Sequence, residues 1–402
     1  MDKILSKVLE KIKPTQEEVS KVKKISNYLI NKIKIKKTKI EFGGSGAKDT
    51  WLTNAKDIDI YVKFDFNEYN PKDISLILEK EIKRHFRIIK LHGSRDYFQI
   101  SQEGFTIEII PILDIKRVED AKNITDISPF HVRYVKKHKK GDEIRLAKAF
   151  CKAQSCYGAE SYIKGFSGYV LEILIIKYGN FNKFIKNVSR WKDKEIIGEK
   201  KYVDRLNRSK KDSPLILIDP VDSNRNAAAA LDKKNYDKLI RSSKLYLNNP
   251  STKFFEKEEF NVDKVKKKYK NQNLIILEVD PLKGKEDVMG AKLLKCLNYI
   301  SRRIELNDFK LIKYDWHWNQ KALFWFVIDK NKLPLYKEHK GPPIENRAAL
   351  ENFKKKWKAI KIKNGYAYTI VKREFTNPNQ FVHYLILNDK NINSLVKSVK
   401  FK

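Results

Sequence analysis

Two aspartates that follow a glycine-rich segment have the spacing of a catalytic pair. Residues 44–50 read GSGAKDT, and Asp57 and Asp59 come shortly after them. The apolar residues around this pair predict a strand, on which side chains two positions apart point the same way. Neighbouring carboxylates repel unless a cation lies between them, and their hard oxygen atoms suit Mg²⁺, which also binds the phosphates of a nucleoside triphosphate. The segment therefore predicts metal-dependent nucleotidyl transfer, with residues 43–46 as a turn for the phosphates.

A third metal ligand is expected from another strand. Residues 105–111, FTIEIIP, form an apolar run that contains one carboxylate, Glu108. In a two-metal site one ion activates the attacking hydroxyl while the other steadies the triphosphate and the leaving group. Asp57, Asp59 and Glu108 are therefore the predicted catalytic and metal-binding residues. The alternative is that they only line exposed strands, since short motifs often match by chance.

The charge of the chain favours a polyanionic partner. Its 402 residues include 85 Lys and Arg against 50 Asp and Glu, which gives a formal charge of +35. Such a charge attracts nucleic acid. The sequence is also rich in Ile and Asn beside Lys, as expected of an AT-rich genome, so part of the Lys excess is expected to be solvated surface without a partner.

Cysteine usage and hydropathy predict a cytoplasmic protein. The chain has three cysteines, Cys151, Cys156 and Cys296. Their spacing is not that of a metal site, and their odd number does not predict a set of disulfides, which is typical of a protein in a reducing compartment. No apolar stretch reaches the roughly 18 residues needed to span a bilayer, and the charged N-terminus lacks the apolar core of a signal peptide. We therefore expect no membrane contact.

Periodicity divides the chain into three predicted domains, and the fold class is predicted to be α+β and multidomain. Residues 1–140 begin with helical periodicity, in which PT at 14–15 opens the second helix, and continue into the α/β segment that carries the carboxylates. Residues 141–260 are mostly helical. Residues 261–402 alternate strands with a Lys-rich helix at 291–304.

Several local expectations concern the middle segment. The longest apolar run, residues 170–176, is interrupted by Glu172 and is predicted to be a buried helix. Residues 192–213 are charge-rich and predict a loop or an exposed hairpin. Residues 226–230, NAAAA, are expected to open a helix, and another is expected to start at the NPS bend of residues 249–251.

A series of short motifs runs along nearly the whole chain. They are GSGAKDTW (44–51) with Asp57 and Asp59, EIIP (108–111), DISPFH (126–131), EIRLAK (143–148), CYGAE (156–160), GFSGY (165–169), DPVD (219–222) with Arg225, PS (250–251) and HKGPP (339–343). Taken in this order, the motifs resemble those of archaeal-type, class I CCA-adding enzymes, which are tRNA nucleotidyltransferases of the polymerase β superfamily. So many pieces in one order are far more specific than any one of them.

The resemblance implies an architecture and a reaction. It implies a polymerase β-like nucleotidyltransferase head, a helical central domain that completes the nucleotide pocket, and an α+β body and tail that bind the acceptor stem and elbow of tRNA. The implied reaction adds or repairs the 3′-terminal CCA of tRNA from CTP and ATP with Mg²⁺, without a nucleic acid template, and releases pyrophosphate. RNA would be held mainly through its phosphates and helical shape. A homodimer is left open.

The resemblance also implies nucleotide-binding residues. Ser45 and Lys48 would hold the triphosphate, for which a hydroxyl and a point charge are suitable groups. His131, Lys148 and Tyr157 would surround the sugar and phosphates. Arg225 would contact the base being selected, because a guanidinium fork can bind the hydrogen-bonding edge of a base.

Each of these roles has a structural alternative when the residues are considered alone. His131 can be a buried structural histidine, and Tyr157 can simply pack. Lys148 can extend from its helix towards solvent, as lysines commonly do. Arg225 can form an ion pair with Asp222 instead of contacting a base.

Three places depart from the family pattern. Glu108 stands where the family usually has Asp, and its extra methylene moves the oxygen atoms by about one C–C bond. RDY at 95–97 replaces the common HPY, and Ile127 stands where Arg is frequent, so one phosphate or sugar contact is expected to be lost or replaced. The chain also ends early for the family, which predicts a shorter tail.

Two other functions fit the sequence. A related terminal nucleotidyltransferase that adds only CC, only A or a longer A tail would share the catalytic residues. A non-catalytic RNA-binding descendant would keep the basic surface and lose the metal site, and Glu108 is the one hint of such a loss. Intact Asp57, Asp59, Ser45 and Lys48 argue against it.

Overall fold

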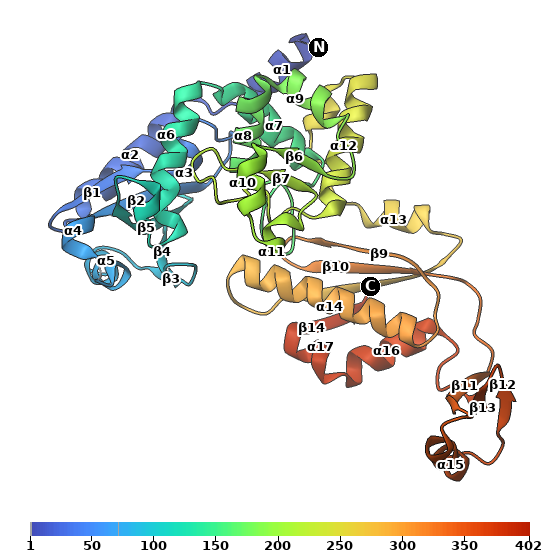
Figure 1. The fold of residues 1–402 in the computed structure, drawn as a ribbon. Coiled ribbons are helices and arrows are strands. Elements are labelled where there is room, and N and C mark those ends of the chain that lie inside the picture. The colour runs from blue at the N-terminus through green and yellow to red at the C-terminus, as the bar shows by residue number, and fades with distance from the viewer. Residues whose placement is uncertain (1, 71) are drawn as a thin grey trace. The chain divides into compact units, whose positions relative to one another are not determined.

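The chain forms two compact units, which consist of residues 1–258 and 259–402. The computed structural model describes residues 2–70 and 72–402, and both units combine helices with sheets (Figure 1). The predicted α+β, multidomain class is therefore confirmed. The division into three domains at residues 140 and 260 stays a prediction.

The first unit opens with two helices and a mixed sheet. Helix α1 spans Asp2–Ile12 and α2 spans Gln16–Lys32. The second helix opens after Pro14-Thr15 as predicted, and Thr15 and Glu18 form a capping box at its start. The apolar face of α2 joins the core of the five-stranded sheet, whose strand order is β1-β2-β5-β4-β3. The strands are β1 (Thr38–Phe42), β2 (Asp57–Asp65), β3 (Ile89–Leu91), β4 (Tyr97–Gln102) and β5 (Phe105–Asp114).

Strands β2 and β5 form the centre of this sheet. They pair in parallel, while β1 pairs antiparallel with β2 and β4 antiparallel with β5. Their inward-facing residues, such as Ile60, Phe64 and Ile107, are fully buried. Short elements connect and cover the strands: α3 (Gly44–Ala47), α4 (Phe66–Tyr69), α5 (Ile74–Ile82), and the 3₁₀ helices η1 (Val118–Asp120) and η2 (Ile124–Ile127).

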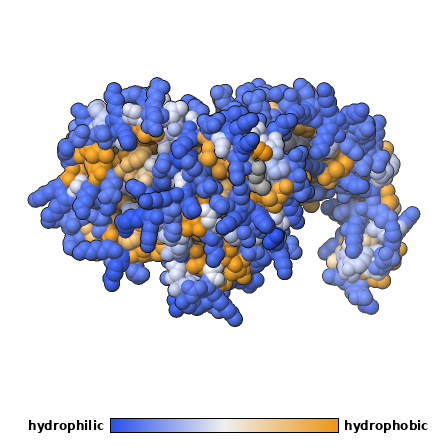
Figure 2. Space-filling view, turned by 90° about the horizontal axis from the view of Figure 1, so that it is seen from above, coloured by the Kyte–Doolittle hydropathy of each residue, from blue (hydrophilic) through white to orange (hydrophobic). Residues whose placement is uncertain are grey.

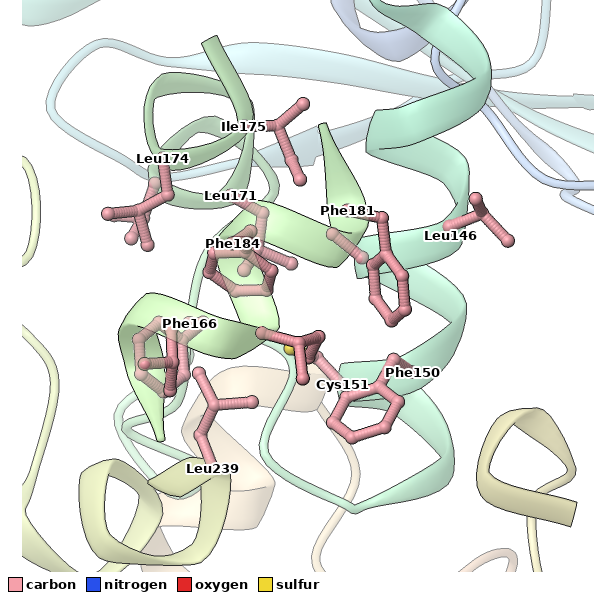
Figure 3. Close-up of a cluster of buried hydrophobic side chains, with 14 of the residues drawn as sticks. Leu146, Phe150, Cys151, Phe166, Leu171, Leu174, Ile175, Phe181, Phe184 and Leu239 are labelled. Atoms are coloured by element: carbon pink, nitrogen blue, oxygen red, sulfur yellow. The ribbon is translucent and has the colours of Figure 1, made fainter. Parts of the chain in front are cut away.

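A second core holds the helical part of the first unit together. It is built from α7 (Gly141–Ala153), α8 (Gly168–Tyr178), α9 (Phe181–Val188) and α12 (Lys233–Asn248), with α6 (Ser128–His138) beside α8. Figure 3 shows the buried side chains that converge from these helices. The rings of Phe150 and Phe181 meet edge to face, 5.7 Å between centroids. The predicted buried helix at 170–176 lies within α8 and is confirmed, and Glu172 is 1% exposed.

Residues 192–213 differ from the prediction of a loop or hairpin. They contain β6 (Glu195–Ile197), α10 (Lys200–Arg205) and α11 (Arg208–Lys211). Strand β6 pairs in parallel with β7 (Leu215–Leu217), which excludes a hairpin between them. The prediction was wrong because a three-residue strand among charged neighbours leaves almost no periodic signal.

The NAAAA segment is a turn, so the helix predicted there was wrong. The Asn226 side chain accepts hydrogen bonds from the backbone N–H groups of Leu217 (2.9 Å) and Ala228 (2.9 Å), which fixes the chain beside β7. Helix α12 starts only at Lys233, after Asp232 caps it. This side-chain bonding outweighs the helical preference of alanine. The NPS bend does start a helix, the short 3₁₀ helix η3 (Thr252–Phe255).

The second unit contains two sheets. Strands β14 (Ser398–Phe401), β8 (Asn273–Asp280), β10 (Ala322–Ile328) and β9 (Leu311–Trp318) form one sheet in that order. Helices α14 (Glu286–Leu306), α16 (Pro378–Asn388) and α17 (Lys390–Leu395) share its core. The predicted Lys-rich helix is α14, and this prediction is confirmed. Before them comes α13 (Val262–Lys268).

A smaller sheet of order β11-β13-β12 completes the second unit. Its elements are β11 (Tyr336–Pro343), α15 (Arg347–Lys356), β12 (Lys361–Lys363) and β13 (Tyr366–Lys372). Hydrophilic residues cover most of the face seen in Figure 2, in keeping with the charge of +35. In the described residues no helix is long and apolar enough to cross a membrane.

Candidate active site

The glycine-rich segment packs directly against Asp59. Instead of a plain turn it forms the one-turn helix α3, and Gly43 N donates a hydrogen bond to Asp59 O (2.8 Å). Gly44 has φ +54, and a β-carbon there would lie 1.6 Å from Asp59 Oδ2. Only glycine combines this conformation with such a close approach. The local sequence therefore brings the backbone of Gly44 against the side-chain carboxylate of Asp59.

The three predicted carboxylates lie on adjacent strands. Asp59 is the register partner of Glu108 in the parallel β2–β5 pair, and Asp57 lies two residues before Asp59 at the start of β2. Burial and then repulsion by Asp57 raise the pKa of Asp59 to about 6, although Lys48 acts in the opposite direction. A divalent cation with oxygen ligands would relieve this repulsion.

The donor set therefore fits a hard cation. Within residues 2–70 and 72–402, no three His, Cys, Asp or Glu side chains are already arranged as a metal-binding group. The strand register brings Glu108 beside Asp59, but the carboxylates of all three residues are not yet gathered. Their assignment as ligands stays a prediction.

Lys48 and Lys148 meet at one buried carboxylate. Glu172 of α8 accepts a hydrogen bond from Lys48 Nζ on Oε2 (2.8 Å) and from Lys148 Nζ on Oε1 (2.9 Å). Thr50 Oγ1 also donates to Glu172 Oε1 (2.9 Å). Burial alone would raise the pKa of Glu172, but the two ammonium groups outweigh it and lower the pKa to about 2. The alternative in which Lys148 extends to solvent is wrong, because its side chain is only 4% exposed.

Tyr157 lies beside this ion-pair cluster. A β-carbon on Gly168 would lie 3.1 Å from Tyr157 Oη and 3.4 Å from Lys148 Cε, so the glycine permits both side chains to approach the start of α8. Burial, and after it the charge of Glu172, raises the pKa of the Tyr157 hydroxyl. The hydroxyl therefore remains protonated and can donate a hydrogen bond.

A second buried carboxylate, Asp219, gathers the other predicted nucleotide-binding residues. It accepts hydrogen bonds from Tyr169 Oη on Oδ1 (2.8 Å) and from Arg225 Nη1 on Oδ2 (3.0 Å). His131 Nε2 lies 3.2 Å from Asp219 Oδ2. Burial alone would raise the pKa of Asp219, but the contact with His131 lowers it. The alternative pairing of Arg225 with Asp222 was wrong in its partner, since the ion pair is made with Asp219.

The ring of Tyr169 lies between the two carboxylate clusters. It stacks on His131 with 4.0 Å between centroids, and Lys48 Nζ lies 5.1 Å from its centroid. The Arg225 guanidinium is 6.0 Å away. All predicted nucleotide-binding side chains except Ser45, which belongs to α3, thus converge around Tyr169, Glu172 and Asp219. Sequence reasoning gave these three residues no role.

Arg145 is a further residue whose role the sequence left open. It is 2% exposed and forms ion pairs with Asp49 and with Asp142, whose oxygen accepts from Nη1 at 2.7 Å. Its Nε donates to Trp51 O (2.9 Å). Helix α7 thereby holds the loop that follows α3, and so it helps to fix the position of the glycine-rich turn.

Family models match two parts of the chain. Residues 142–256 match the tRNA nucleotidyltransferase second domain, and residues 274–400 match the CCA-adding enzyme C-terminal domain. The CCA-adding enzyme of Nanoarchaeum equitans is 36% identical over 98% of this chain and 97% of its own length. The chain belongs to the archaeal CCA-adding enzymes. The resemblance inferred from the ordered motifs is therefore confirmed.

Other CCA-adding enzymes agree over nearly the full length. The enzyme of Methanocaldococcus jannaschii is 30% identical over 94% of this chain and 89% of its own length. Among solved structures, that of the Cid1 poly(U) polymerase covers 64% of this chain and 98% of its own, with a TM-score of 0.53 and 13% identity. The latter similarity supports the polymerase β-like nucleotidyltransferase fold alone.

In this member of the CCA-adding enzymes, the contact between Gly44 and Asp59 leads to a testable prediction. We expect Gly44→Ala to lower kcat/KM for nucleotide incorporation by roughly 10²-fold, since a misplacement of about 1 Å near reacting groups has an effect of that size. The new methyl group must displace Asp59 Oδ2 or unfold the turn. Steady-state incorporation of labelled CTP into tRNA measures the change.

Gly104 offers the matched control. It also has positive φ (+80), but a β-carbon there would meet no atom within 4 Å. Gly104→Ala should therefore carry similar backbone strain and leave kcat/KM close to that of the wild type. Equal losses in the two variants would show that strain, and not the contact with Asp59, is responsible.

Proposed function

We propose that the chain builds or repairs the 3′-terminal CCA of tRNA from CTP and ATP by magnesium-dependent nucleotidyl transfer. The observation that carries this proposal is the near-full-length match to CCA-adding enzymes. The site supports it, because a glycine-rich turn, two strand carboxylates and two lysines converge there. The reaction would take place in the cytoplasm, in keeping with three buried free thiols.

Asp57, Asp59 and Glu108 would hold Mg²⁺. The bound ions would neutralise phosphate charge and lower the pKa of the attacking 3′ hydroxyl. The high pKa of Asp59, about 6, supports this role, since the residue is poorly stabilised as an anion by its protein neighbours. Glu108 replaces the usual Asp, and its longer side chain would need a different rotamer to bring its oxygen atoms to the same place.

The triphosphate would lie along the turn, with Ser45 and Lys48 as its nearest side chains. Lys148, on α7, and Tyr157, in the segment between α7 and α8, would contact phosphate or sugar groups near the start of α8. A further observation supports a ligand-binding role for His131: its Nε2 is buried without a well-aligned hydrogen bond. The atom lies 3.2 Å from Asp219 Oδ2, so an incoming group would share it with that carboxylate.

Arg225 would contact the base of CTP or ATP. It projects from the turn that follows β7, where Asp219 holds its guanidinium through Nη1. A cavity of about 400 Å³ is lined by Val221, Asp222 and Asn224 of the same turn and by residues of η1 and η2, but not by Arg225 itself. Guanidinium nitrogens that do not bond Asp219 remain for a base edge.

Transfer would occur by in-line attack of the tRNA 3′ hydroxyl on the α-phosphate. The new bond joins this oxygen to phosphorus, and the bond to the β-phosphate oxygen breaks to release pyrophosphate. Two rounds use CTP and a third uses ATP. The turn and the lysines would position the triphosphate, because positioning and charge stabilisation provide most of the acceleration in phosphoryl transfer.

The second unit would bind the acceptor stem and elbow of tRNA. One face of its small sheet exposes Tyr366 and Ile370, and Lys340 Nζ lies 3.4 Å from the Tyr366 ring centroid. Lysines beside aromatic rings suit phosphates and bases alike. In this proposal residues 1–140 act as catalytic head, 141–260 complete the nucleotide pocket, and 261–402 form the RNA-binding body and tail.

The test is incubation of purified protein and Mg²⁺ with tRNA that ends at the discriminator base. We expect two additions with CTP alone and a third only when ATP is also present. A ladder with ATP alone would show a tailing enzyme, and arrest after CC with both nucleotides present would show a CC-adding enzyme. Addition of A only, seen when tRNA ending in CC is supplied as a second substrate, would show an A-adding enzyme. Tight tRNA binding without extension would favour the non-catalytic alternative and would contradict the proposal.

A further inference from the structure

Glu172 is a buried titratable residue to which the proposed reaction assigns no step. Its side chain is 1% exposed, and it lies on α8, more than 120 residues after the turn that it contacts. Each of its oxygen atoms accepts from one lysine, and Oε1 also accepts from Thr50. A carboxylate buried this deeply is stable only when charged partners and hydrogen bonds replace water.

The groups that Glu172 holds come from two elements that are far apart in the sequence. Lys48 and Thr50 belong to the segment that follows α3, whereas Lys148 lies on α7. Lys148 Nζ also donates to Thr50 O (3.2 Å) and Thr50 Oγ1 (2.8 Å), which joins the turn to α7 a second time. Glu172 thus fixes the distance between the two lysines as well as the end of the turn.

The two lysines differ in how they are held. Lys148 bonds Glu172 and both oxygen atoms of Thr50, and its side chain is 4% exposed. Lys48 bonds Glu172, lies over the Tyr169 ring and is 11% exposed. Lys48 is therefore the more exposed of the two lysines and has fewer hydrogen-bond partners, which leaves it better placed to meet a phosphate. A flexible lysine loses much side-chain entropy when it is fixed, and a buried carboxylate that fixes it beforehand reduces that cost on binding.

We propose that Glu172 is a positioning residue for nucleotide binding, which holds Lys48 and Thr50 in place so that the turn presents Lys48 to the triphosphate. This inference rests on the proposed function and deepens it. It assigns Glu172 no contact with substrate. Its effect reaches the nucleotide through Lys48 and through the end of the turn.

The test combines Glu172→Gln with Lys48→Met in a double-mutant cycle. We expect Glu172→Gln to raise KM for CTP and ATP about tenfold or more with a smaller change in kcat, the size expected for losing a charge-assisted hydrogen bond. In the Lys48→Met background the same change should have a clearly smaller effect. Additive effects of the two substitutions would overturn the proposal.

A second pair of variants covers the case in which Glu172→Gln does not fold. Thr50→Val removes only the hydroxyl that bonds Glu172 and Lys148, and it should raise KM several-fold, whereas Thr50→Ser should restore it. An unchanged KM in Thr50→Val, or failure of Thr50→Ser to restore it, would contradict positioning through Glu172.

Direct calorimetry of CTP binding with Mg²⁺ and without tRNA separates this inference from the proposed function. If the wild type binds CTP but does not add it to tRNA, the proposed function fails. The double-mutant cycle can then still be evaluated from the dissociation constants for CTP in place of KM. If the wild type adds CCA and the cycle is additive, only the positioning role fails. Absence of CTP binding by the wild type would overturn both.

Discussion

Replacement of Asp59 by alanine is expected to abolish nucleotide incorporation and to leave tRNA binding intact. Asp59 is the carboxylate against which the glycine-rich turn packs, and it is the register partner of Glu108. Loss of a metal ligand that stabilises transition-state charge removes about 4 kcal/mol or more, which corresponds to at least ~10³-fold in rate. Single-turnover addition of CTP to tRNA measures the rate, and filter binding measures the affinity for tRNA.

Glu41→Ala serves as the control for loss of an acidic residue from the same sheet. Glu41 lies on β1, directly beside β2, and its exposed side chain pairs with Lys63. Lys63 keeps a second partner in Asp114, so the sheet should remain intact and the rate should stay near that of the wild type. Turnover by Asp59→Ala within tenfold of wild type would refute the assignment of Asp59 to the metal.

Local sequence signals predicted the elements that carry the site. The Pro-Thr pair at residues 14–15 marks the start of α2, and the alternation around Asp57 marks β2. Both signals are contained within a few residues, where spacing alone determines which side chains share a face. The predictions of helix α2 and of the strand at Asp57 are therefore confirmed.

The partners of the buried carboxylates could not be predicted in the same way. Glu172 was visible as one charge in an apolar run, but its partners Lys48 and Lys148 come from segments 124 and 24 residues away. Asp219 follows a three-residue strand, and nothing in its neighbourhood indicates His131 as a contact. Such pairings depend on tertiary packing, which no local pattern contains.

The parallel pairing of β2 with β5 shows a related limit. The sequence predicted that Glu108 lies on a strand, and the prediction holds. The match of Asp59 with Glu108 depends on the register between the two strands. A slip of one position would place the Glu108 side chain on the opposite face of the sheet from Asp59. Local spacing can therefore propose a third carboxylate but cannot establish which residue it faces.

The departure at Arg95 leads to the second large prediction, that Asp126→Ala strongly destabilises the first unit. Arg95 donates to both oxygen atoms of Asp126, which is 0% exposed. Asp126 also accepts from the backbone N–H of Leu113 (2.9 Å), Lys122 (3.1 Å) and Asn123 (2.9 Å). Its loss leaves a guanidinium and three backbone donors without their partner, so we expect the free energy of unfolding in urea to fall by roughly 3–5 kcal/mol.

Asp120→Ala is the matched control, because Asp120 belongs to the same connecting segment and also pairs with an arginine. That partner, Arg117, is largely exposed, so water can replace the interaction and stability should stay close to wild type. Equal stability of the Asp126 and Asp120 variants would contradict a buried anchoring role. The predicted difference also explains the RDY departure: Arg95 serves to bind η2 to the end of β5, and a nucleotide contact at this position is not needed to account for the residue.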